Sequence, residues 1–210
     1  GSPCRDRVIF ATSDLRLWST DEVGVPIGQP VTPIPTVSNP NCAAGETRAN
    51  LAIVPAGPGG GFFVRNAAGT VHVIIDAVGY LSPDGGHVFT VDGPRRLFDT
   101  RKPASPLTGA FGPGQERSVT VVGGSVPADA TAVVLNVTAT EGTAPSHVTA
   151  WPTGATVPPT SALNWPAGAT RPNLVIVPVG DDGRVSFRNH TGSVHLVADG
   201  ADNASPDLFL

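Results

Sequence analysis

A repeated stretch constrains the fold of this chain more than any other feature. Residues 44–76 and 167–199 align without a gap, so that each copy carries the same glycines, a Thr-Arg pair, an Asn-Leu pair and an Ile-Val-Pro run. Such self-similarity predicts one structural unit built twice. We therefore expect two tandem related units, residues 3–84 and 88–210. The first lacks counterparts to the opening elements of the second, which predicts a truncated or degenerate unit.

Composition indicates strands rather than helices. The 210 residues include 25 glycines, 22 prolines and no methionine, and only 14% are charged. This suits short strands joined by tight turns. Asn50–Pro55 and Asn173–Pro178 are apolar runs of strand length that end at turn residues. We expect an all-β fold of two β-sandwich-like units made of short antiparallel strands, with a β-trefoil or small barrel as the alternative.

The end of each copy predicts a β-hairpin. If Thr191-Gly192 is a two-residue turn, strand 185–189 pairs with the strand that follows it, and Arg188 lies opposite His195. These two side chains would then share a polar face with Asp199. Three further segments are interpreted in the same way: a strand at 62–66, a hairpin of 7–12 with 15–19, and its counterpart of 132–140 with 147–152.

The cysteines and the net charge limit where the chain acts and on what. Cys4 and Cys42 are the only two cysteines and have no metal-ligand spacing. We expect a disulfide between them, which favours an oxidising compartment, although two buried thiols are the alternative. A net charge of −4 offers no basic surface to nucleic acid. No run approaches the roughly 18 apolar residues of a membrane helix, so we expect no membrane insertion.

Four motifs of the second copy resemble a known repeat. RRLFDTR (95–101), AVVLNVTAT (132–140), HVTAWPTG (147–154) and the segment 168–199 are similar to a tandem repeat of secreted and cell-surface proteins of actinobacteria. The resemblance implies a secreted or surface location and an accessory role, since such repeats are often appended to secreted hydrolases. It brings no catalytic or ligand-binding residues with it.

Catalytic and metal-binding patterns are absent from the sequence. There is no GxSxG elbow for a nucleophilic serine, the acidic residues lie mostly in turns, and the five histidines have no HxxxH or HExxH spacing. The sequence therefore predicts a chain that is not an enzyme and that holds neither a cofactor nor a metal.

The repeated polar residues that strand and turn geometry does not explain are the candidates for ligand contact. The candidates are Arg65, His72 and Asp76 in the first copy, Arg171, Asn173, Arg188, Asn189, His195 and Asp199 in the second, and Trp18 and Trp151 as stacking platforms. In one interpretation they hydrogen-bond a polysaccharide or a cell-envelope glycan. In the other they bind backbone carbonyls or an acid such as Asp99 and lock the layers of the sandwich together. The sequence thus leaves a binding module and a purely structural surface repeat open.

Overall fold

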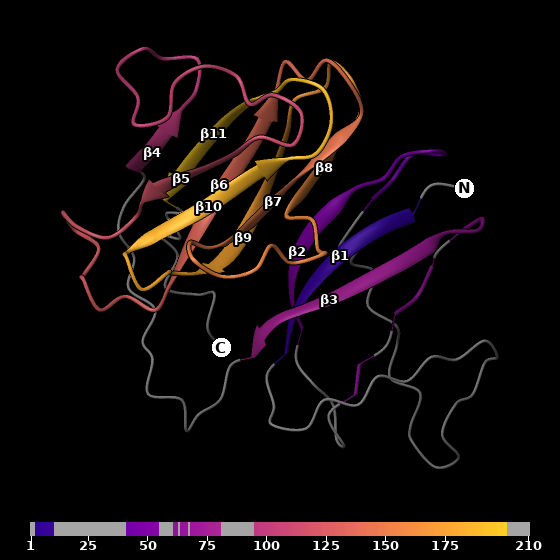
Figure 1. Cartoon of the computed structure of the whole chain (residues 1–210). Helices are drawn as coiled ribbons and strands as arrows, with labels where there is room; N and C mark the ends of the chain where they lie inside the picture. The colour runs from indigo at the N-terminus through magenta and orange to yellow at the C-terminus, as the bar shows by residue number, and fades with distance from the viewer. Residues whose placement is uncertain are drawn as a thin grey trace.

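The computed structural model describes residues 3–10, 41–54, 61–62, 64–66, 68–80 and 95–200, the first of these ranges by its backbone alone (Figure 1). No helix occurs in the described residues, and the all-β prediction is confirmed. The expected strand 15–19, Trp18 and most of the expected boundary between the units lie outside the described residues.

The second unit is a sandwich of two four-stranded antiparallel sheets. One sheet has the order β4-β11-β6-β9 and the other β5-β10-β7-β8 (Figure 1). The strands are β4 (Arg95–Asp99), β5 (Glu116–Thr120), β6 (Ala132–Thr140), β7 (Ser146–Pro152), β8 (Leu163–Trp165), β9 (Arg171–Pro178), β10 (Arg184–Asn189) and β11 (His195–Gly200).

The core of this unit lies between the two sheets. Inward-facing residues alternate along the strands, as the period of two requires. Phe187 of β10 and Leu196 of β11 are both fully buried, and the ring of Phe187 meets the ring of Phe98 edge to face at 5.3 Å between centroids. Since Phe98 belongs to β4, this aromatic pair joins one sheet to the other.

The predicted hairpins of the second unit are wrong, because most consecutive strands lie in opposite sheets. β10 pairs with β5 and β7, whereas β11 pairs with β4 and β6, so Arg188 does not lie opposite His195. β6 and β7 are separated in the same way. A turn flanked by alternating apolar residues is typical of a hairpin, but it is equally compatible with a connection from a strand of one sheet to a strand of the other. Phe187 and Leu196 belong to the same buried core but to opposite sheets.

The described strands of the first unit keep the strand order of the second. β1 (Pro3–Phe10) lies between β2 (Ala49–Val54) and β3 (His72–Tyr80). In the repeat, β2 corresponds to β9 and β3 to β11, and β6 lies between those two strands as β1 lies between β2 and β3. The units thus share a three-strand order, β2-β1-β3 and β9-β6-β11.

Strand direction in the first unit differs from the expectation. β1 runs parallel to both neighbours, whereas β6 is antiparallel to both of its own. Parallel pairing needs a connection of about a dozen residues or more, which the segment 11–48 between β1 and β2 supplies. The described residues of 62–66 form no strand, so that predicted element is wrong as well.

The two units touch through β2 and β9, which are equivalent strands of the two copies. β2 contacts β9 and β8 (Figure 1). Glu46 accepts hydrogen bonds from Nη2 of Arg48 at 3.3 Å and from Nη2 of Arg171 at 2.9 Å, and these arginines occupy the same position in the two copies. Hydrogen bonds from the Ala43 amide and from Arg171 lower the pKa of the Glu46 carboxyl. Arg171, a ligand candidate in the sequence, thus holds one unit against the other.

Candidate functional site

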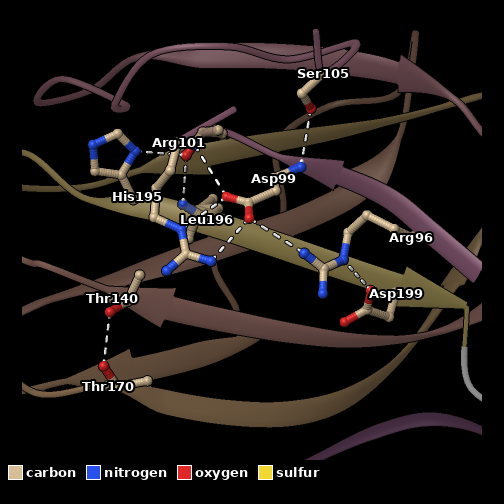
Figure 2. Close-up of polar contacts among 10 residues, drawn as sticks. Arg96, Asp99, Arg101, Ser105, Thr140, Thr170, His195, Leu196 and Asp199 are labelled. Carbon is tan, nitrogen blue, oxygen red and sulfur yellow. Dashed lines mark hydrogen bonds and ion pairs between the residues drawn. The ribbon is translucent and has the colours of Figure 1, made fainter. Parts of the chain in front are cut away.

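The segment Asp99-Thr100-Arg101 at the end of β4 builds a polar network around Asp99, whose side chain is only 3% exposed. Oδ1 of Asp99 accepts hydrogen bonds from the backbone N of Arg101 at 3.0 Å and from its side-chain Nε at 2.9 Å (Figure 2). Oδ2 of Asp99 accepts one from Nη2 of the same arginine at 2.8 Å. Nη1 of Arg96 adds a fourth at 3.2 Å. This two-pronged arginine contact is the geometry that makes charge-assisted pairs strong.

The network stabilises the ionised form of Asp99. Hydrogen bonds from the Arg101 side chain, which outweigh the opposing effect of burial, lower the pKa of Asp99 from 3.8 to about 2. A carboxylate whose pKa is lowered by folding stabilises the folded chain at every pH at which it is ionised. The segment is therefore a structural anchor for the end of β4.

We expect acid to remove this stabilisation between about pH 4 and pH 2. Because the folded pKa lies below the unfolded one, the contribution is fully present above the unfolded value and is lost as pH falls to the folded value. Arg101 and Arg96 are about half exposed, so solvent weakens their attraction for Asp99. The contribution of ionised Asp99 to the free energy of unfolding is therefore about 1–2 kcal/mol. Urea unfolding of the wild type and of Asp99→Asn at several pH values measures it.

The matched control is Asp129→Asn, which removes an exposed carboxylate that has no partner among the described residues. The difference in unfolding free energy between wild type and Asp99→Asn should shrink on acidification, whereas the difference for the control should stay near zero. A gap for Asp99→Asn that is the same at pH 2 and pH 6 would contradict this account of the network.

His195 and Asp199, two predicted ligand residues, fasten β11 to β4. Nδ1 of His195 lies 2.9 Å from Oγ1 of Thr100, which also accepts the amide of Leu196 at 3.0 Å. Asp199 is paired with Nε of Arg96 (Figure 2). Sequence reasoning missed the parts played by Thr100 and Arg96, although it singled out the segment that holds them.

Asn189, another candidate, is fully buried at the end of β10 and is bonded on both sides of its amide. Nδ2 donates to the carbonyls of Gly192 at 2.7 Å, Gly112 at 3.1 Å and Phe111 at 3.4 Å, and Oδ1 accepts from Ser146 at 3.0 Å. Asn66, its counterpart in the first copy, donates to the carbonyl of Gly69 at 2.8 Å. The repeated Asn-x-x-Gly therefore closes the same turn twice.

The remaining candidates divide between buried and exposed positions. Nδ2 of Asn173 donates to the carbonyl of Ala162 at 2.7 Å inside the fold. Trp151 is 3% exposed, so its ring offers no accessible face for stacking. Arg65 and His72 are exposed and Asp76 is half-buried, with the latter two on β3. The structure therefore does not bring the predicted residues together into one polar face.

One polar cleft does form, on the outer face of the sheet that contains β10. It has a volume of about 240 Å³ and is lined by Arg188, His190, His147 and Thr149, with Val157, Pro158 and Pro159 as its apolar wall. The imidazoles of His147 and His190 are stacked, with centroids 4.6 Å apart and planes 19° apart. The side chains of Arg188 and His190 make no hydrogen bond or ion pair with any described group, whereas their backbones take part in the hydrogen bonds of the fold.

Sequence reasoning selected Arg188 but missed the two histidines of this cleft. Arg188 and His190 are two positions apart, so the alternation of β10 carried a signal for their shared face. His147 comes from β7, and only the pairing of Arg188 with Thr149 and of Asn189 with Val148 brings it near. The register between β7 and β10 is a property of the fold that spacing alone does not specify.

No model of a known protein family matches the chain, and no curated protein compared with it matches either. The resemblance to the actinobacterial repeat therefore stays a prediction from motifs. None of the described residues forms a helix with the length and apolarity needed to cross a membrane. Within the same residues, no three His, Cys, Asp or Glu side chains gather as metal ligands would.

Proposed function

We propose that the chain is a secreted, non-enzymatic module that binds a polysaccharide or a cell-envelope glycan, as an accessory to a larger protein. One observation carries the proposal: the side chains of Arg188 and His190 line one cleft and make no hydrogen bond or ion pair in the described fold. Secretion is supported by the disulfide predicted between Cys4 and Cys42, which stays a prediction because the side chain of Cys4 lies outside the described residues.

The chemistry of the cleft suits a sugar. An arginine fork and imidazole nitrogens offer hydrogen bonds to hydroxyl groups, while the proline wall offers an apolar surface to the C–H face of a ring. A volume of about 240 Å³ lies just below the range of ~300–1,000 Å³ that holds drug-sized ligands. It therefore fits one ring of a longer chain better than an enclosed small molecule.

Co-sedimentation with insoluble cell-wall polysaccharide and a soluble glycan array test this proposal. We expect the wild type to be retained, and Arg188→Ala and His190→Ala each to weaken retention about tenfold, the loss of about 1.4 kcal/mol expected for one hydrogen bond to a charged or polar group. Lys102→Ala is the matched control, since it removes an exposed cation that is not part of the cleft lining. Failure of the wild type to bind any glycan, or equal retention of all variants, would overturn it.

A structural surface repeat is the second candidate, and the bonding of Asn173, Asn189 and Asp199 within the fold favours it. In this case the repeated polar residues exist to space or assemble units, as the Glu46–Arg171 pair between the two units does. Light scattering separates the two proposals. A concentration-dependent assembly without glycan binding supports the structural role, and a monomer that binds glycan removes it.

A further inference from the structure

The outer edge of β3 is equivalent to an edge that is occupied in the second unit. β3 ends the order β2-β1-β3, and its counterpart β11 has β6 on one side, as β3 has β1. On the other side β11 pairs with β4 in antiparallel register. No described strand pairs with the corresponding side of β3. An open strand edge of this kind exposes backbone N–H and C=O groups that can template another strand.

In the second unit, β4 contributes side chains as well as backbone bonds. Thr100 binds the imidazole of His195 and the amide of Leu196, and Arg96 is paired with Asp199 (Figure 2). Arg96 of β4 and Thr100, the residue that follows this strand, thus match Asp199 and His195 on β11, and the members of each pair are four positions apart.

The first unit has counterparts of His195 and Asp199, but its described residues include no strand that corresponds to β4. His72 and Asp76 lie on β3 where His195 and Asp199 lie on β11, yet neither side chain has a hydrogen bond or ion pair within the described chain. Val73 is 40% exposed, whereas its counterpart Leu196 is fully buried. With respect to the described residues, the edge therefore carries unpaired backbone groups, two polar side chains without bonds and an exposed apolar side chain.

We propose that the edge of β3 is a binding site for an extended segment with the chemistry of β4, an Arg-x-x-Asp-Thr strand supplied by another polypeptide. The segment adds antiparallel to β3, with its arginine at Asp76 and its threonine at His72 and the Val73 amide. Main-chain hydrogen bonds provide the affinity and the two side-chain pairs provide the specificity, as in other cases of strand addition. The site lies on β3, away from the glycan cleft, and does not depend on that cleft.

A labelled peptide of residues 94–103, PRRLFDTRKP, tests the proposal by fluorescence anisotropy with the intact chain at about 150 mM salt, which limits nonspecific attraction. We expect saturable binding, weakened at least fivefold by His72→Ala, by Asp76→Asn and by alanine at the peptide's arginine or threonine that matches Arg96 or Thr100. A scrambled peptide of the same composition controls for attraction between the cationic peptide and the chain, whose net charge is −4.

Amide hydrogen exchange locates the bound peptide. The proposal expects new protection within 73–79. Loss of protection at 95–99 instead would show that the peptide displaces β4 from β11 and would overturn the proposal. So would equal binding of the scrambled peptide, or amides along β3 that are already fully protected without peptide.

Discussion

Phe187→Ala is expected to lower the free energy of unfolding by about 3–5 kcal/mol, the usual cost of removing a fully buried aromatic ring from a core. Phe187 is completely inaccessible and its ring packs on Phe98 of the opposite sheet. The truncation therefore opens a cavity at the junction of both sheets instead of at the surface of one. Urea unfolding followed by tryptophan fluorescence measures the change, since Trp151 and Trp165 are buried in the same unit.

The repeat supplies the matched control for this substitution. Val64 occupies the position of Phe187 in the first copy and is more than half exposed. We expect Val64→Ala to change the unfolding free energy by less than about 0.5 kcal/mol, as for an exposed side chain without special contacts. A loss below about 1 kcal/mol for Phe187→Ala would contradict the sandwich core described here.

Asn189→Ala has the second-largest expected effect, a loss of about 3 kcal/mol. The substitution removes a buried amide that satisfies three carbonyl oxygens and the Ser146 hydroxyl. Each buried group left without a partner costs about 1–3 kcal/mol, and some of these groups lie near enough to the surface to recover a water. Urea unfolding again measures the loss.

Asn66→Ala is the control, because Asn66 makes the equivalent bond to Gly69 in an exposed turn. We expect it to cost about 0.5–1 kcal/mol, the net value of one solvent-exposed hydrogen bond. Equal costs at Asn66 and Asn189 would mean that the shared turn bond, and not burial, sets the energy, contrary to our account.

The sequence predicted strand content and repeat equivalence but not strand pairing. Glycine and proline spacing and apolar runs such as Asn173–Pro178 are local signals, and they placed β9 correctly. The partner of a strand depends on where the following turn leads. Thr191-Gly192 lies between strands of opposite sheets, and a two-residue turn signal does not distinguish this crossing from a hairpin.

The candidate site was only partly predictable for the same reason. Asn66 and Asn189, which the sequence separated from the turn residues, both bond within a turn, and the sequence does not show which carbonyl or acid lies opposite each polar side chain. Asn189 faces inward and bonds the loop at Gly112, while its neighbour Arg188 faces outward into the cleft. His147 became a cleft residue only through the pairing of β7 with β10.

The unfolding midpoints of Arg188→Ala, His190→Ala and Asn189→Ala, measured side by side by thermal denaturation, test the central claim most directly. The claim is that Asn189 holds the fold, while the side chains of Arg188 and His190 have no bonding role in the described fold. We expect Arg188→Ala and His190→Ala to stay within about 2 °C of the wild type and Asn189→Ala to fall by about 6–12 °C. A fall for Arg188→Ala as large as that for Asn189→Ala, or an unchanged midpoint for Asn189→Ala, would contradict it.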